Sequence, residues 1–171
     1  MSMSDKRTAI VTGASRGIGA GLVEAFLKEG YNVLATSRKV SQSLTATPCL
    51  VLVDGDIGKR ETAARAVEAT VRHFGTIDVL VSNAGIFCTK PFTDFTPEDF
   101  NALISTDLLG FFHITQFAVK EMLKQKSGSV VSITAALADQ RVAGFSCPIP
   151  PWPWLPPCSM RSVPRLHKPA G

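Results

Sequence analysis

Cysteine and charge are both scarce in this chain, and these shortages exclude several classes of protein. The four cysteines have neither CxxC spacing nor a Cys/His pattern, which excludes a zinc module and favours reduced thiols. The formal net charge is only +4, and no cluster of Lys and Arg is dense enough to follow a phosphate backbone. We therefore expect no metal site and no nucleic-acid partner.

Long apolar stretches are also lacking. No apolar run approaches the length of a membrane span, and the basic, polar residues 1–7 lack the apolar segment of a secretory signal. These observations predict a cytoplasmic protein with no membrane partner. The 171 residues are most simply one domain that is large enough to bury a sizeable core.

The most informative feature that is present is a glycine-rich turn. Its residues, Thr12-Gly13-Ala14-Ser15-Arg16-Gly17-Ile18-Gly19, follow the apolar segment 8–11 and precede an amphipathic stretch of good helix formers. Glycines adopt backbone angles that are closed to other residues, and they leave no side chain to obstruct a pyrophosphate. The free N–H groups and the dipole of a helix start favour the charge of that group. The turn therefore predicts a dinucleotide site.

Strand and helix patterns alternate along the first 144 residues. Predicted strands cover 7–12, 32–36, 49–53, 77–81 and 128–134, and predicted helices cover 17–29, 59–74 and 97–126. The last helix begins with a start signal, Thr96-Pro97-Glu98-Asp99. The strands are continuous apolar runs, which is typical of a parallel sheet covered by helices on both faces. We predict an α/β fold, a Rossmann-type doubly wound parallel sheet, with its ligand crevice beside residues 12–19.

The composition changes abruptly near residue 145. Residues 148–171 contain eight of the eleven prolines, and both tryptophans lie within 145–157. A helix and a central strand are both excluded there. We therefore divide the chain into a dinucleotide-binding domain, 1–144, with a sheet that is incomplete at its C-terminal side, and a Pro/Trp-rich tail, 145–171. We expect this tail to be extended and poorly ordered, or non-native.

Three motifs together make residues 6–144 resemble the classical short-chain dehydrogenase/reductase family. The turn from Thr12 to Gly19 matches the family's cofactor turn. Ser82-Asn83-Ala84-Gly85 is similar to its Asn-Asn-Ala-Gly segment, and Asp56-Ile57 follows the third predicted strand like the family's acidic residue at the adenine ring. The resemblance implies hydride transfer between a nicotinamide coenzyme and a small carbonyl or alcohol substrate. It implies a coenzyme site of these residues: Thr12, Gly13, Ser15, Arg16, Gly17, Ile18, Gly19, Ser37, Arg38, Asp56, Ile57, Asn83, Ala84 and Gly85.

The charge at the end of the second predicted strand bears on the choice of coenzyme. NAD-binding proteins place an acid there, which accepts a hydrogen bond from the ribose 2′-hydroxyl. Here the position holds Ser37, followed by Arg38, and Arg16 in the glycine turn adds a second positive charge. Because guanidinium groups match a phosphate, we predict NADP(H) in preference to NAD(H). The alternative is that Arg16, Arg38 and Lys39 are ordinary solvated charges.

The catalytic positions of the family are all altered. As the resemblance implies, the chemistry uses a tyrosine whose pKa is lowered by a lysine four residues later, a serine that holds the substrate oxygen, and an asparagine on the long helix. The asparagine position falls on Asp107 and the serine position on Ala135. The single tyrosine, Tyr31, opens the second predicted strand, and the Pro/Trp-rich tail occupies the expected Tyr-x-x-x-Lys region. We therefore predict no catalytic residue in this sequence.

These features leave three hypotheses open. The chain is an NADP(H)-dependent reductase that keeps its nucleotide half with little catalysis, or it is a non-catalytic nucleotide-binding module, a pseudoenzyme whose Pro-rich end docks a partner. The third and favoured hypothesis is that the end arose from a shifted reading frame, alternative splicing or truncation. The family pairs its subunits through the long helix and the helix after the fifth strand, so we expect at most a weakened homo-oligomer.

Overall fold

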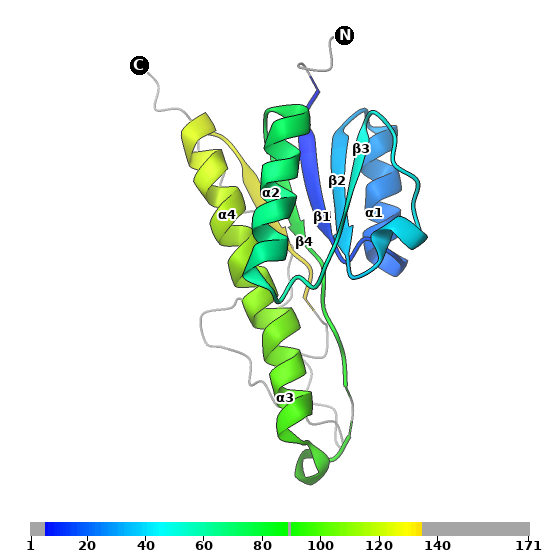
Figure 1. Ribbon diagram of the computed structural model, residues 1–171, viewed down its shortest axis with the longest axis vertical. Helices are drawn as coiled ribbons and strands as arrows, with labels where there is room; N and C mark the ends of the chain where they lie inside the picture. Colours follow the sequence, from blue (N-terminus) through cyan, green and yellow to red (C-terminus); the bar gives the residue numbers. More distant parts are fainter. Residues whose placement is uncertain (1–5, 89, 135–171) are drawn as a thin grey trace.

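The computed structural model describes residues 6–88 and 90–134, which form one parallel sheet flanked by helices (Figure 1). The elements follow in this order: β1 (Thr8–Thr12), α1 (Gly17–Lys28), β2 (Asn32–Ser37), the 3-10 helix η2 (Val40–Gln42), β3 (Leu50–Asp54), α2 (Arg60–Phe74), β4 (Val79–Ser82), the 3-10 helix η3 (Phe92–Asp94), α3 (Pro97–Leu103), the π-helix η4 (Ile104–Leu109), α4 (Gly110–Gln125) and β5 (Ser129–Ser132). The predicted tail, 145–171, and Ala135 lie outside the described residues.

The sheet has the strand order β3-β2-β1-β4-β5, and every neighbouring pair is parallel. The chain therefore proceeds from β1 outward to β3, returns to the other side of β1 as β4, and continues to β5. This reversal between β1 and β4 defines a doubly wound sheet, so the predicted fold class is confirmed.

Both faces of the central strands are buried, as the continuous apolar runs predict. On one face, Ile10 and Leu34 pack with Ala66 of α2 and Ile114 of α4. On the other face, residues such as Val11 and Val33 pack with α1. Complete burial of an Ile or Leu side chain contributes about 1.5–3 kcal/mol. The helices are therefore held on the sheet mainly by these apolar contacts.

The fourth strand begins two residues later than predicted, at Val79 instead of residue 77. The backbone of Ile77 is bound instead by the side chain of Gln125, at the end of α4. Its amide accepts a hydrogen bond from the N–H of Ile77 at 2.9 Å and donates one to the carbonyl of Ile77 at 3.0 Å. A side chain therefore occupies both backbone groups of Ile77.

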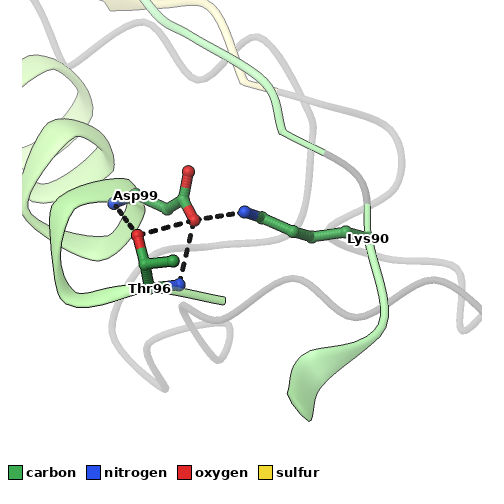
Figure 2. Close-up of polar contacts among 3 residues, drawn as sticks. All are labelled: Lys90, Thr96 and Asp99. Atoms are coloured by element: carbon green, nitrogen blue, oxygen red, sulfur yellow. Dashed lines mark hydrogen bonds and ion pairs between the residues drawn. The ribbon is translucent and has the colours of Figure 1, made fainter. Parts of the chain in front are cut away.

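The predicted long helix is present, but its hydrogen bonding is not uniform. It runs from Pro97 to Gln125 and changes to a π-helix over Ile104–Leu109. Its start has the predicted cap: Thr96 Oγ1 accepts from the N–H of Asp99 at 3.3 Å, and Asp99 Oδ2 accepts from the N–H of Thr96 at 2.9 Å. Figure 2 shows that Lys90, from the preceding loop, forms an ion pair with the same carboxylate.

One helix among the described residues is long and apolar enough to cross a membrane by length and composition alone. It is the same 29-residue helix, Pro97–Gln125, so the sequence-based expectation of no such run does not hold by this measure. Ile114, Ala118 and Met122 of this helix are buried against the sheet, although only 22% of its apolar window is buried.

Candidate functional site

A cleft of about 710 Å³ opens beside the reversal between β1 and β4, at the carboxyl ends of the strands. Its walls are the segments that follow β1, β2, β3 and β4. The volume lies within the range of roughly 300–1,000 Å³ that is usual for small-molecule sites. Twelve of the residues predicted to hold a coenzyme line the cleft: Gly13, Ser15, Arg16, Gly17, Ile18, Ser37, Arg38, Asp56, Ile57, Asn83, Ala84 and Gly85.

The glycine turn is built by close backbone packing. A Cβ on Gly13 would lie 2.8 Å from Ala84 Cα, and a Cβ on Gly19 would lie 2.3 Å from the carbonyl oxygen of Gly13. Neither position has room for a side chain. Gly17 has open space around it but a φ of +57°, a conformation that is unfavourable for other residues. The turn therefore needs glycine for two separate reasons, space and backbone conformation.

The start of α1 lies at the cleft, which Arg16, Gly17 and Ile18 line. The side chain of its N-cap residue, Arg16, makes no capping hydrogen bond within the described part of the chain, and the first turn of the helix contains no acidic residue. The first N–H groups and the positive end of the helix dipole therefore favour an anion. Ile18, in the same turn, is 63% exposed at the cleft.

Thr12 and Asn83 join the glycine turn to the segment after β4. The hydroxyl of Thr12 accepts from the N–H groups of Asn83 at 3.0 Å and Ala84 at 2.9 Å. The amide of Asn83 donates to the carbonyls of Thr12 at 2.9 Å and Gly13 at 3.4 Å. Thr12 and Gly19, both predicted coenzyme residues, do not themselves line the cleft. They build the turn that does.

The end of β2 supplies the positive charge of the cleft. Arg38 and Lys39 follow Ser37 there, and Arg16 lines the cleft as well. Asp56 is the one acidic residue among the described lining residues, and its carboxylate accepts from the N–H of Gly58 at 2.9 Å, which closes its own turn. The hydroxyl oxygen of Ser37 is buried with no hydrogen-bond partner among the described residues. The positive charges that line the cleft therefore favour an anionic ligand.

Asp107 lies on the π-helix, and its carboxylate accepts from the N–H of Ile86 at 2.9 Å. Burial raises the pKa of Asp107, and the hydrogen bond from Ile86 lowers it only in part. The neighbouring Thr106 and Ile86 line the cleft, whereas Asp107 does not. At the position where the resemblance implies an asparagine, the chain therefore has a carboxyl group that binds the loop after β4.

Tyr31 packs far from this chemistry. Its ring lies 5.1 Å from that of Phe26, and the guanidinium of Arg7 lies 4.7 Å above it. Both contacts support a packing role.

Sequence reasoning missed seven lining residues or gave them no coenzyme role: Thr36, Lys39, Gln42, Ser43, Gly55, Ile86 and Thr106. Gly55, Ile86 and Lys39 lie close behind strand ends, so their position alone could have indicated them. Gln42 and Ser43 reach the cleft because η2 folds back beside β3, for which the local sequence has no signal.

The fold and the cleft define a class of protein, the doubly wound α/β proteins that bind dinucleotides at the reversal of the sheet. The family model described as short chain dehydrogenase matches residues 7–147, and the chain belongs to that family. An 11-beta-hydroxysteroid dehydrogenase-like 3 protein of Arabidopsis thaliana is 32% identical over 143 residues, which are 78% of this chain and 46% of that protein.

Two solved structures have the same fold. The structure described as "ElxO with NADP Bound" has a TM-score of 0.73 and 28% identity, covering 82% of this chain and 60% of that one. The ligand-free aldohexose dehydrogenase of Thermoplasma acidophilum has a TM-score of 0.74 and 26% identity, covering 83% of this chain and 55% of that one. The chain thus spans about half of the length of the proteins that it matches.

Proposed function

We propose that this chain binds a nicotinamide dinucleotide in the cleft, prefers NADP(H), and is impaired in hydride transfer. The observation that carries the proposal is the start of α1, which no side chain caps in the described part of the chain and which lies at the cleft beside Arg16 and Arg38. Membership of the family and the fold shared with an NADP-bound protein support the coenzyme class.

The residues that line the cleft fit the parts of such a coenzyme. The N–H groups at the start of α1, from Gly17 onward, would hold the pyrophosphate. Ser37 and Arg38 would meet the 2′-phosphate, and Asp56 with Ile57 would meet the adenine. Asn83, Ala84 and Gly85 would border the remaining part. When bound, the coenzyme would supply the hydride that reduces a carbonyl to an alcohol.

The proposed impairment depends on the side chains at the family's catalytic positions. Asp107 and Ala135 replace an asparagine and a serine, and the one tyrosine of the sequence is Tyr31. A positioned acid or base contributes about 10²–10⁴ in rate, so turnover of a small carbonyl or alcohol should be low. A non-catalytic nucleotide-binding module is the alternative with the same binding site.

Isothermal titration calorimetry on the 171-residue chain tests the coenzyme preference. NADPH should bind more tightly than NADH. Arg38→Ala should weaken the binding of NADPH by about tenfold, since a hydrogen bond to a charged group contributes about 1.5–3 kcal/mol. The affinity for NADH should change little. Arg72→Ala, in the last turn of α2 and outside the cleft, is the matched control. The absence of heat with both coenzymes on folded protein would refute the proposed site.

An activity assay distinguishes an active reductase from a chain that binds the coenzyme without turnover. NADPH oxidation is followed with a panel of ketones and quinones. Clear turnover would show that the impairment is wrong and that the chain is a reductase. Binding without turnover is the expected result.

We also propose a cytoplasmic location and a weakened homo-oligomer. Phe112 and Leu123 on α4 are 50% and 58% exposed, and such apolar side chains support contact with another protein surface. Sedimentation as a monomer at every concentration would contradict the oligomer.

A further inference from the structure

The loop after β2 is fastened from outside the cleft by one carboxylate. Asp54 is the last residue of β3, and Ser41 lies in η2. Asp54 Oδ1 accepts from the N–H of Ser41 at 2.9 Å, and Asp54 Oδ2 accepts from the hydroxyl of Ser41. Neither residue lines the cleft. We refer to these two hydrogen bonds as the Ser41–Asp54 pair.

The residues on both sides of Ser41 do line the cleft. They are Lys39, Gln42 and Ser43, next to Arg38. Val40, between them, is fully buried in the core on the α1 side of the sheet. The loop therefore has an apolar anchor at Val40 and a polar anchor at Ser41, and these two anchors determine where its cleft-lining residues lie.

The carboxylate itself is held on a rigid element. Asp54 is in register with Ser37 of β2, and its backbone carbonyl accepts from the guanidinium of Arg65 at 3.0 Å. The next residue, Gly55, donates its N–H to the carbonyl of Ser37 at 2.9 Å. The hydrogen bond from the Ser41 hydroxyl also lowers the pKa of Asp54, so the carboxylate is ionised at neutral pH. The pair therefore connects a fixed strand end to the loop.

We propose that Asp54, acting through Ser41, is a positioning residue for coenzyme selection: it holds the loop 39–43 so that its cleft-lining residues meet the 2′-substituent of the adenosine ribose. The inference rests on the proposed coenzyme site, in which the 2′-substituent lies at the end of β2. Ser41 and Asp54 themselves make no contact with the coenzyme.

The charge of Asp54 and its hydrogen bonds have opposite effects on a phosphate. As a nearby negative charge, Asp54 disfavours a 2′-phosphate, so Asp54→Asn would tighten binding if charge alone mattered. As the partner of Ser41, it favours the phosphate by ordering the loop, so the same substitution would weaken binding. Ser41→Ala removes one hydrogen bond and leaves the net charge unchanged, which isolates the positioning effect.

The test uses the two forms of the adenosine moiety as probes, 2′,5′-ADP and 5′-AMP, in calorimetric titrations of the full chain. Ser41→Ala should weaken the binding of 2′,5′-ADP by about fivefold, the equivalent of one hydrogen bond, and change the binding of 5′-AMP by less than about twofold. Asp54→Asn should shift the ratio of the two dissociation constants in the same direction. Ser41→Thr keeps the hydroxyl and should restore this ratio. Thr45→Ala, exposed on the same loop and outside the cleft, is the control.

Four outcomes would overturn the inference. Equal weakening of both probes would indicate a general loss of structure. Tighter 2′,5′-ADP binding by Asp54→Asn with no effect of Ser41→Ala would show that Asp54 acts only through its charge. Failure of the unmutated chain to bind either probe would refute the coenzyme site as well, whereas normal binding with unchanged ratios in the variants would refute the positioning role alone.

Discussion

Single residues in the cleft act in two ways, by facing the ligand space and by building the wall behind it. Arg16 and Arg38 line the cleft, whereas Thr12 connects β1 to the segment after β4 through its hydroxyl. Asp107 belongs to the second group, because it does not line the cleft and its carboxylate accepts from the N–H of Ile86, which does. A carboxylate at this position is less suitable than an amide, since it loses hydration on burial.

Asp107→Asn should therefore raise the free energy of unfolding at neutral pH. Burial raises the folded-state pKa of Asp107 above its ordinary value of 3.8, so the folded state binds the proton more strongly than the unfolded state. Stability then falls as the pH rises from 3.8 through the folded-state pKa. Asparagine still accepts from Ile86 and carries no charge. Urea unfolding between about pH 3 and 7 should give a difference that is small at the acid end and grows with pH.

Asp94→Asn provides the control for this substitution, because Asp94 lies on an exposed 3-10 helix. Identical pH profiles for the original chain and Asp107→Asn would show that burial of this carboxyl has no cost.

At the scale of elements, the long helix shows how local and distant contacts combine. Its start is determined locally by the Thr96–Asp99 capping box, to which Lys90 adds an ion pair (Figure 2). Its π-helix, Ile104–Leu109, coincides with the segment that reaches the cleft and the loop after β4. Such a bulge is frequent at functional sites, because it changes the direction of a few side chains without ending the helix.

Thr96→Ala should lower the free energy of unfolding by about 1 kcal/mol, the usual contribution of an N-cap side chain.

Asp99→Asn, in the same capping box, should change how the free energy of unfolding depends on pH at the acid end. The hydrogen bond from Lys90 lowers the pKa of Asp99 from 3.8 to about 2, so its stabilisation is complete above 3.8 and disappears as the pH falls through about 2. Thermal melts between about pH 2 and 6 measure both effects. An unchanged acid limb in Asp99→Asn would contradict the ion pair.

For the whole molecule, the two ends of the cleft are connected by close packing between distant segments. A Cβ on Gly58, in the turn after β3, would lie 2.3 Å from Ser105 Oγ and 2.7 Å from the Ser105 carbonyl oxygen. A Cβ on Gly110 would lie 2.8 Å from Ile57 Cγ2. The turn that carries Asp56 and Ile57 is therefore packed directly on the π-helix that carries Asp107.

Gly58→Ala should destabilise the protein by about 1–3 kcal/mol, the usual effect of forcing a methyl group into a filled space, because the backbone of Ser105 has to move. Gly21→Ala is the matched control. Gly21 lies on the exposed side of α1 with open space around it, so alanine should stabilise by about 0.5–1 kcal/mol. Denaturant unfolding measures both, and equal effects of the two substitutions would refute the packing argument.

Much of the fold could be predicted because its signals are local. The apolar runs, the glycine turn and the Thr96 cap each depend on neighbouring residues, and the predicted strands and helices occur with small shifts at their ends. For the site, twelve of the predicted residues line one cleft, since parallel strands bring their carboxyl ends to one edge of the sheet. The coenzyme role of these residues remains a prediction.

The remaining features depend on groups that are distant in the sequence. The amide of Gln125 binds the backbone of Ile77, and Asp54 accepts hydrogen bonds from Ser41 in the loop after β2. The hydroxyl of Thr12 accepts from the N–H groups of Asn83 and Ala84, in the segment after β4. The sequence by itself determined the strands and helices of a doubly wound parallel sheet and the glycine turn, because hydrophobic periodicity and backbone conformation are encoded residue by residue. Only the tertiary structure decided which polar groups meet, because hydrogen bonds between distant segments form after packing has brought those segments together.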